Sequence, residues 1–383
     1  MGHAQSELSI VADPAPVSHA RVPVARPQLP TADAALPYLR AIDASRTYSN
    51  FGPLNARFEA RLAAHFGVDA DCVVTCCSAT SGLTLALQAA AARGGRYCLM
   101  PAWTFVATAH AAVAAGLTPY LLDVDPETGA LGVETACSAL AAIGRHEAAA
   151  VMPVAPFGAP LDPAPWDSFE QQTGVAVVID AAAGFDGLSV GRTPAVVSLH
   201  ATKLLGVGEG GFFISRDAAA VAVARSRSSF GFDGSREAQR SGANAKLSEL
   251  AAAYGLAALD AWRDQRAAYQ AVFDRYLAAF EGLRGLTLAR GMGRTWIAST
   301  FNIAAPMAAT HEIERRLEGS GVATRRWWGA GLHRHPAFRD LPRTDLAVTE
   351  RLAAETLGLP CWPGLPSQSI DAIATVVRGV LGR

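Results

Sequence analysis

The fold is decided by the stretch CVVTCCSATSGLTLALQAAAARGGRYCLMP, residues 72–101. It opens with one short apolar run, CVVT at 72–75, and closes with another, YCLMP at 97–101. The segment between them, ATSGLTLALQAAAAR at 79–93, has the length and apolar content of a helix, and Gly94 and Gly95 follow it as a helix stop. The stretch therefore predicts a strand, a helix and a second strand.

The same alternation continues along the chain. Further apolar runs that end at turn or polar residues are PYLLD at 119–123, AAVMPV at 149–154, VAVVID at 175–180, AVVSL at 195–199 and GGFFIS at 210–215. Earlier in the chain, helices are predicted at 33–43 and 54–66. Apolar strands that alternate with helices indicate an α/β protein with a mostly parallel sheet, covered by helices on both faces.

Changes in composition predict three parts. Residues 1–22 are rich in Ala, Pro, Ser and His and lack periodicity, which predicts a flexible tail. Residues 23–260 contain the strand–helix alternation, so we expect them to form a large domain. Residues 246–282 have the pattern of one or two long helices, and shorter mixed elements follow. We therefore expect residues 261–383 to form a smaller α+β domain.

Charge and cysteine content exclude several classes of protein. The 383 residues include 33 Lys and Arg against 34 Asp and Glu, a net charge of -1, which argues against a nucleic-acid partner or a membrane partner. No apolar run approaches the roughly 20 residues of a membrane span, and the first ten residues lack the pattern of a secretory signal. The six cysteines have no zinc-site spacing. We expect a cytoplasmic protein with reduced thiols and no metal.

Ligands of an open parallel sheet bind just beyond the carboxyl ends of its strands, so residues at those ends are candidate site residues. They are Ser78, Ala79 and Thr80 after 72–75, Trp103 after 97–101, Asp180 at the end of 175–180, Ser198 near the end of 195–199, and Lys203 five residues later. If the strands are parallel, all of these residues gather at one edge of the sheet.

These residue types have complementary chemistry. Small hydroxyl residues at a helix N-terminus form an anion site, because the free N–H groups and the helix dipole face the ligand, and Ser198 can reach the same phosphate. A carboxylate can keep a ring nitrogen protonated, an aromatic side chain can stack on a flat ring, and a lysine can form an imine with an aldehyde. Phosphate, pyridine nitrogen, flat ring and aldehyde together describe pyridoxal 5'-phosphate (PLP).

The segment SLHATKLLGVGEGG at 198–211 resembles the signature of the DegT/DnrJ/EryC1/StrS family of PLP-dependent nucleotide-sugar aminotransferases, members of fold type I in the aspartate aminotransferase superfamily. The family's Ser, His, Schiff-base Lys and Gly-Glu-Gly-Gly turn match Ser198, His200, Lys203 and residues 208–211. Other similar segments are FGPLNARFE at 51–59, PAWTFVAT at 101–108, VIDAAAGF at 178–185, GANAKLSEL at 242–250, GVATRRWW and LHRHPAF within 321–338, and LGLPCW at 357–362. The resemblance implies a large domain with a mostly parallel seven-stranded sheet between helices and a smaller α+β domain.

The resemblance also implies roles for individual residues. Lys203 would form the Schiff base with PLP and move the proton between substrate and cofactor, and Asp180 would hold the pyridine nitrogen charged. Trp103 would stack on the ring. The phosphate would be bound by Ser78, Ala79, Thr80 and Ser198.

Three further positions carry implications for the partner subunit and the substrate. Asn244 matches a residue that reaches the phosphate of the neighbouring subunit, which implies a homodimer with two shared active sites. Lys246 and His333 match positions that face the nucleotide-sugar. The sequence departs from the family at Ala183, where Gln or His usually contacts the cofactor's phenolic oxygen. Asn50 or a water molecule could take over that contact.

The resemblance implies that the protein transfers an amino group from L-glutamate to a nucleotide-linked keto-sugar. Lys203 argues against relatives that carry His at this position and act as sugar 3-dehydratases. The form Asn-x-Lys-x-Ser at 244–248 favours a 4-keto-6-deoxyhexose, linked to dTDP, UDP or GDP. Two alternatives stay open: a nucleotide-free substrate such as a keto-cyclitol or an aminobenzoate precursor, and a PLP-binding protein without turnover.

Overall fold

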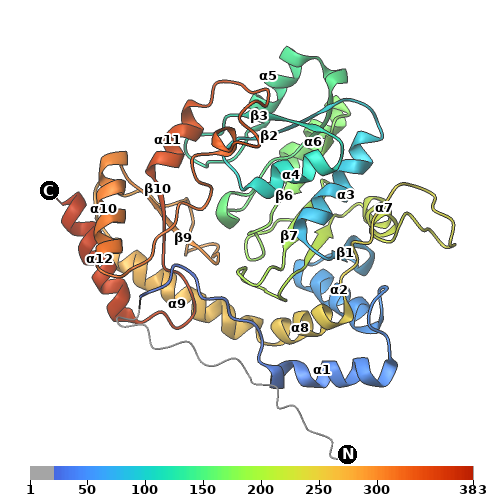
Figure 1. Ribbon diagram of the computed structural model, residues 1–383, viewed down its shortest axis with the longest axis horizontal. Helices are drawn as coiled ribbons and strands as arrows, with labels where there is room; N and C mark the ends of the chain where they lie inside the picture. Colours follow the sequence, from blue (N-terminus) through green and yellow to red (C-terminus); the bar gives the residue numbers. More distant parts are fainter. Residues whose placement is uncertain (1–20, 383) are drawn as a thin grey trace, which may run out of the picture.

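The computed structural model describes residues 21–382 (Figure 1). The predicted tail, 1–22, lies outside the described residues except for Arg21 and Val22. The backbone N–H of Val22 donates to the carbonyl of Gly321 at 3.0 Å, so the described part of the chain begins alongside its C-terminal half. Among these described residues, none of the helices has both the length and the hydropathy of a membrane span.

A seven-stranded sheet forms the centre of the large part of the protein. Its strands are β1 (Val73–Cys76), β2 (Tyr97–Pro101), β3 (Thr118–Leu122), β4 (Ala148–Val151), β5 (Ala176–Val177) with β6 (Ile179–Asp180), β7 (Ala195–Ser198) and β8 (Gly211–Ile214). β5 and β6 are two halves of one extended segment, because the intervening Val178 N–H donates to Val151 O at 3.0 Å. The strand order is β3-β2-β4-β5/β6-β7-β8-β1, and β8 runs antiparallel to its neighbours. The mostly parallel sheet that was predicted is confirmed.

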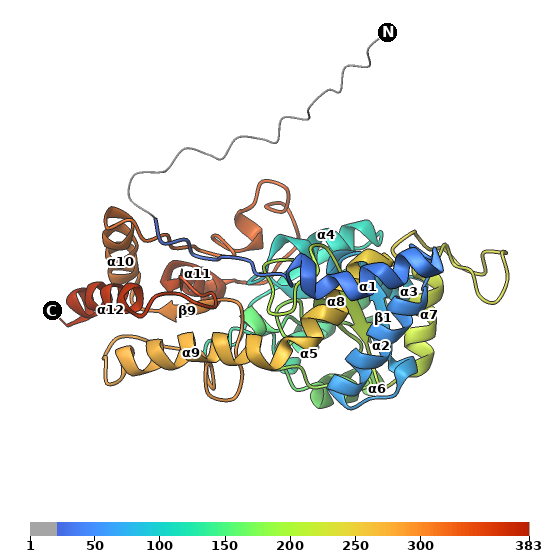
Figure 2. The ribbon, with the colours of Figure 1, turned by 90° about the horizontal axis from the view of Figure 1, so that it is seen from below.

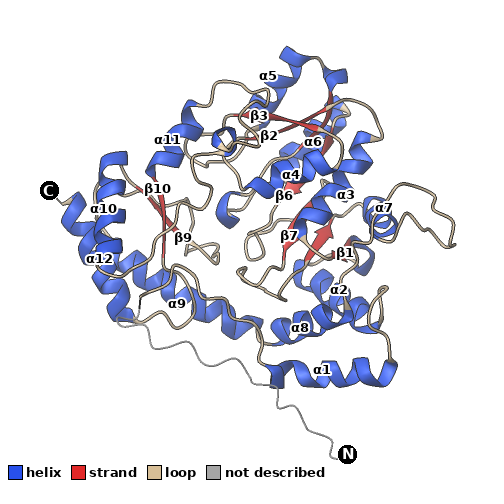
Figure 3. Ribbon diagram, viewed as in Figure 1, coloured by secondary structure: helices blue, strands red, loops and turns tan. Residues whose placement is uncertain are grey.

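Helices cover both faces of this sheet (Figure 3). The helices of the large part are α1 (Ala32–Ser45), α2 (Pro53–Phe66), α3 (Ala79–Ala91), α4 (Val106–Ala114), α5 (Val133–Ile143), α6 (Ala164–Thr173), α7 (Ala218–Ser228) and α8 (Glu249–Asp260). Successive strand residues point to opposite faces. Val74 accordingly packs in the core with α3, α4 and α7, while its neighbour Val73 packs in a separate core with α2 and α8.

Gly52, in the FGPLN segment, is required by close packing against Glu249. The buried carboxylate of Glu249 accepts hydrogen bonds from the backbone N–H groups of Leu54 and Asn55, both at 2.8 Å, and so caps the first turn of α2. A β-carbon at Gly52 would lie 2.7 Å from the Glu249 carboxyl carbon. Only glycine leaves room for this side chain from a distant helix.

The C-terminal half builds a second, smaller core at one end of the molecule (Figure 2). Its elements are α9 (Trp262–Phe280), β9 (Phe301–Ala304), α10 (Met307–Gly319), α11 (Ala347–Glu355), β10 (Thr356–Leu359) and α12 (Ser367–Leu381). β9 and β10 pair antiparallel, and Phe301 and Leu357 on them pack against Tyr276 and Ile373. The long apolar stretch at 246–282 forms two helices, α8 and α9, which are separated at Ala261.

One segment of the C-terminal half returns to the large sheet. Leu121 of β3 donates its N–H to Pro342 O at 2.9 Å and accepts from Thr344 N at 3.0 Å, so residues 342–344 extend the edge of the sheet. Leu332 and Phe338 enter the same core as α3 and α4. This segment also carries His333 toward the carboxyl ends of the strands. The division of the chain into domains at 23–260 and 261–383 stays a proposal.

Candidate active site

The N-terminus of α3 lies at the carboxyl end of β1 and is built as an anion site. Ser78 caps the helix, its Oγ accepting from the backbone N–H of Ser81 at 3.1 Å. Ala79 and Thr80 are the first two helical residues. Their backbone N–H groups have no partner within the helix, so an anion placed here meets free donors and the positive end of the helix dipole.

Gly211 joins this helix start to the strand that carries Ser198. Gly211 pairs with Cys76 of β1 on one side and with Ser198 of β7 on the other. A β-carbon at Gly211 would lie 2.6 Å from the backbone nitrogen of Ala79, closer than any side chain allows. The close approach places Ser198 two strands away from the start of α3 at the same edge of the sheet.

Asp180 ends β6 at the same edge and is 5% exposed. Its Oδ2 accepts a hydrogen bond from Thr108 Oγ1 at 2.8 Å, and its Oδ1 accepts from the backbone N–H of Ala182 at 3.1 Å. Burial raises the pKa of this carboxyl, while the two hydrogen bonds and the charge of Lys203 act to lower it. The carboxylate is therefore oriented from two sides in a site of low dielectric.

Lys203 is half-buried in the turn between β7 and β8. Its backbone N–H donates to His200 O at 2.8 Å, and the N–H of Ala201 donates to Gly208 O at 2.8 Å, so the turn is closed on itself. Loss of hydration lowers the pKa of the Lys203 amine, and the nearby Asp180 opposes this shift. A lowered pKa increases the neutral, nucleophilic fraction of the amine.

Trp103 lies within a cluster of three aromatic side chains. It is 4% exposed and meets Phe157 and Trp328 edge-on, with ring centroids 6.0 and 5.1 Å away. Phe157 and Trp328 stack on each other at 3.8 Å with an interplanar angle of 16°. Phe157 follows closely on Ala155, whose N–H donates to the backbone carbonyl of Asp180 at 2.9 Å, so the loop that carries Phe157 is attached to the end of β6.

Asn244 and Lys246 lie on the long loop between α7 and α8, which extends past α7 at the right of Figure 1. Asn244 is exposed, and its Oδ1 accepts from Lys246 Nζ at 2.7 Å. The same ammonium lies 4.8 Å from the centre of the Phe230 ring. Cys77 N donates to Ala245 O at 2.7 Å, which fixes this loop to the end of β1.

His333 is buried beside the aromatic cluster. The N–H of the preceding Leu332 donates to Ala102 O at 2.9 Å, next to Trp103. His333 Nε2 lies 3.3 Å from Glu350 Oε1, while its buried Nδ1 has no partner among the described residues. Burial lowers the pKa of His333, partly offset by Glu350, which favours the neutral form of the ring.

The side chain of Ala183 is a methyl group, so it offers no hydrogen-bond partner to a cofactor. A β-carbon at Gly158 would lie 2.5 Å from Ala183 O, so the two loops pack directly against each other. Asn50, the alternative donor, is exposed and has a positive φ of 65°. Sequence reasoning missed Thr108, Phe157 and Trp328, although Thr108 and Trp328 both fall in segments that resemble the family.

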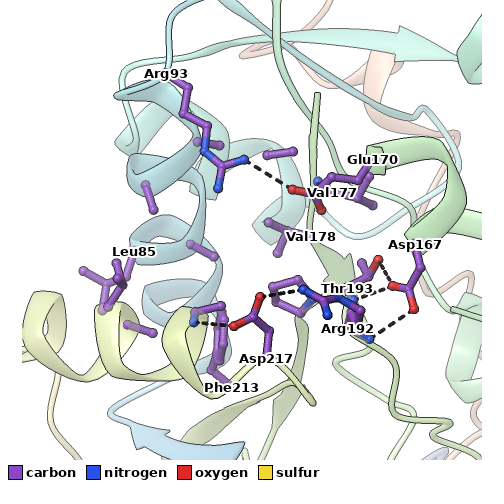
Figure 4. Close-up of a pocket in the computed structure, with 18 of the residues that line it drawn as sticks. Leu85, Arg93, Asp167, Glu170, Val177, Val178, Arg192, Thr193, Phe213 and Asp217 are labelled. Carbon is purple, nitrogen blue, oxygen red and sulfur yellow. Dashed lines mark hydrogen bonds and ion pairs between the residues drawn. The ribbon is translucent and has the colours of Figure 1, made fainter. Parts of the chain in front are cut away.

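A cavity lies elsewhere, at the opposite end of the strands. It has a volume of about 640 Å³ between α3, α6 and α7, with an apolar floor that includes Val178 and Phe213. Two ion pairs, Arg93–Glu170 at 3.3 Å and Arg192–Asp217 at 3.4 Å, lie at this cavity (Figure 4). None of the strand-end residues lines it. This cavity is therefore not the active site, because none of the residues that could bind or react with a cofactor lines it.

Seven strands between helices, with an anion site, a buried carboxylate and a half-buried lysine at one edge, define a fold type I PLP-dependent enzyme. The chain belongs to the DegT/DnrJ/EryC1/StrS aminotransferase family, whose model matches residues 31–378. The family, fold class, enzyme class and cofactor predicted from the sequence are confirmed.

Individual relatives are similar over most of their length. The chain is 30% identical to the protein Mb3436c of Mycobacterium bovis, over 94% of this chain and 90% of that one. It is 25% identical to the dTDP-4-amino-4,6-dideoxy-D-glucose transaminase of Shigella dysenteriae, over 93% and 98%. The crystal structure of DesI in the presence of its TDP-sugar product superimposes with a TM-score of 0.83 at 32% identity, over 95% and 93%.

The residues present fit PLP. The lack of a β-carbon at Gly211 lets the start of α3 pack directly against β8, and the free N–H groups of that helix start suit a phosphate. The buried Asp180 can pair with a protonated ring nitrogen, and Lys203 supplies an amine of lowered pKa. When bound, PLP supplies the aldehyde and the electron-withdrawing ring that transamination needs.

Proposed function

We propose that this enzyme transfers an amino group from L-glutamate to a nucleotide-linked keto-sugar, specifically an NDP-4-keto-6-deoxyhexose. The observation that carries the proposal is that buried Asp180 and half-buried Lys203 lie close enough for each charge to shift the pKa of the other, at the edge of the sheet where α3 begins. The sugar part of the proposal is supported by the relatives, since the Shigella transaminase is named for a dTDP-amino sugar and DesI was solved with a TDP-sugar product.

Each strand-end residue has a role in this proposal. Lys203 binds the cofactor covalently and moves the proton between the substrate carbon and the cofactor. Asp180 holds the ring nitrogen charged, and Trp103 stacks on the ring within its aromatic cluster. The phosphate is bound by Ser78, Ala79, Thr80 and Ser198. The carboxylate of Asp180 must be ionised for its role, and the amine of Lys203 neutral.

We further propose a homodimer in which Asn244 acts in the partner's active site. Its exposed amide supports this role, because it lies beside the end of β1 at the base of the loop and is accessible to a second subunit. Lys246 and His333 are proposed to contact the nucleotide-sugar. All six cysteines lie within the described residues and are free, which supports a reducing, cytoplasmic location.

The decisive experiment is an absorption spectrum of the purified protein with PLP, recorded before and after L-glutamate is added. Conversion of the PLP band to that of the pyridoxamine form is expected. A band that forms but does not move would contradict glutamate as donor, or show that the group missing at Ala183 has cost the protein its turnover. A panel of acceptors then tests the sugar: preference for a nucleotide-free keto-inositol over any NDP-keto-sugar would overturn that part of the proposal.

A further inference from the structure

Two buried threonines on and before α4 form a chain of hydrogen bonds that ends on the carboxylate of Asp180. Thr108 Oγ1 donates to Asp180 Oδ2 at 2.8 Å, and Thr104 Oγ1 lies 2.8 Å from Thr108 Oγ1. Thr108 is 0% exposed and Thr104 is 1% exposed. We propose that Thr108, supported by Thr104, is a positioning residue that keeps Asp180 ionised and aimed at the pyridine nitrogen of the cofactor. The inference rests on the proposed role of Asp180.

The direction of the protons in this chain follows from the chemistry of its last member. An ionised carboxylate only accepts hydrogen bonds, so the single hydroxyl proton of Thr108 is committed to Asp180. Thr108 must then accept from Thr104. Both hydroxyl dipoles therefore point their positive ends toward Asp180, and each polarises the next in a buried site.

The arrangement is unlike the usual role of a threonine in a helix. Such a hydroxyl commonly bonds to a backbone carbonyl of the preceding turn, as Thr84 does with Thr80 O at 2.9 Å in α3. Thr108 instead has two side-chain partners, and one of them lies 72 residues away along the chain. Its hydroxyl therefore contributes to the site rather than to α4.

The hydrogen bond from Thr108 opposes the effect of burial on the pKa of Asp180. Removal from water favours the neutral form of a carboxyl, and in Asp180 this effect exceeds the others. The groups that favour its ionised form are Thr108, the N–H of Ala182 and the ammonium of Lys203. The hydrogen bonds from Thr108 and Ala182 are present whatever the charge of the Lys203 nitrogen, so they favour the ionised carboxylate throughout.

The test is the affinity of the full-length apoprotein for PLP, measured by titration between pH 5 and pH 9, a range that spans the ionisation of a buried carboxyl. Thr108→Val keeps the shape and removes the hydroxyl. It is expected to bind PLP about tenfold more weakly at pH 7, the usual cost of one hydrogen bond to a charged group. The pH below which affinity falls should move upward. Thr108→Ser should restore the wild-type profile, and Thr104→Val should shift it in the same direction by less.

Two further variants separate the possible failures. Thr310→Val removes a buried hydroxyl from the first turn of α10, where it bonds only to backbone carbonyls, and should leave the PLP profile unchanged. Asp180→Asn should weaken PLP binding and flatten its pH dependence. If Asp180→Asn weakens binding while Thr108→Val and Thr104→Val match the wild type, the threonine proposal is overturned alone. If Asp180→Asn binds PLP normally, the role of Asp180 falls and the threonine proposal falls with it.

Discussion

Gly211 and Ala79 belong to elements far apart in the chain, yet a β-carbon on Gly211 would lie 2.6 Å from the Ala79 backbone nitrogen. The next nearest atoms are also backbone, at 2.9 Å, so no flexible side chain could move aside. Gly211→Ala must therefore displace the start of α3, where the cofactor phosphate is proposed to bind. Overpacking of this kind costs about 1–3 kcal/mol. We expect PLP affinity to fall about tenfold or more, measured by titration of the apoprotein.

Gly379→Ala is the matched control for this substitution. Gly379 lies in α12, and a β-carbon there would meet nothing within 4 Å. Alanine also favours the helix by about 1 kcal/mol relative to glycine. This variant should bind PLP as the wild type does and unfold no more easily. Wild-type PLP affinity in Gly211→Ala would show that the phosphate does not depend on the position of the α3 start.

The lowered pKa of Lys203 predicts the pH dependence of cofactor capture. The neutral amine is the nucleophile, so the rate at which the apoprotein binds PLP covalently rises with pH and levels off near the pKa of the amine. Because burial lowers that pKa, the plateau should be reached below pH 10.5, the usual pKa of lysine. Stopped-flow absorbance at a series of pH values measures it. A rate that climbs tenfold per pH unit as far as pH 10 would contradict a lowered pKa.

A variant at Asp180 tests how its charge affects the pKa of Lys203. Asp180 raises the pKa of Lys203, against the larger effect of burial. Asp180→Asn removes this attraction, so the pKa of Lys203 should fall further and the plateau of the rate should shift to lower pH. Lys203→Ala should show no covalent capture at any pH, with the far-ultraviolet circular dichroism of the wild type.

Trp328 connects the C-terminal half to the aromatic cluster around Trp103. Trp328→Ala removes a stacked contact with Phe157 and an edge contact with Trp103, each worth about 0.5–1.5 kcal/mol. We expect the free energy of unfolding to fall by about 1–3 kcal/mol and the absorption band of bound PLP to change, because Trp103 loses its support. Urea denaturation and the spectrum of the bound cofactor measure the two effects.

The adjacent Trp327 gives a control of similar size. Its indole packs over Gly358 of β10 and beneath the guanidinium of Arg325, away from Trp103. Trp327→Ala should lower stability but leave the PLP band unchanged. Equal changes of the band in both variants would mean that the spectrum reports general loosening, not the support of Trp103.

The sheet and its site edge were predictable because strands and strand ends leave local signals. Apolar runs flanked by turn residues located every strand of the seven-stranded sheet but neither β9 nor β10, and a parallel sheet brings Asp180 and Ser198 to one edge by topology alone. Thr108 could not be found in this way. A threonine in a helix is unremarkable, and only the packing of α4 against β6 shows that its hydroxyl meets a carboxylate 72 residues away.

Other features of the site depend on contacts that have no periodic pattern. Phe157 has a positive φ of 53°, which no turn motif in the sequence announces. Residues 332–346 lie within the predicted smaller domain, and Leu332, Phe338 and Leu346 pack in the core with β2 and β3. Their placement is set by tertiary packing and by the hydrogen bonds of Leu121, which local sequence does not encode.

If the active site is shared between two subunits, two inactive variants should restore activity in a mixed dimer, which a site built from one chain would not allow. If Asn244 acts in the partner's site, Lys203→Ala and Asn244→Ala damage different halves of the same site. In a mixed dimer of the two variants, one site carries both substitutions and the other carries neither. Each variant alone should have little activity, and the mixed dimer, purified with two affinity tags, should recover about half of the wild-type rate, since one of its two sites is intact. Wild-type-like activity of Asn244→Ala alone would contradict its role, and a mixed dimer as inactive as Lys203→Ala would place Asn244 in the site of its own chain.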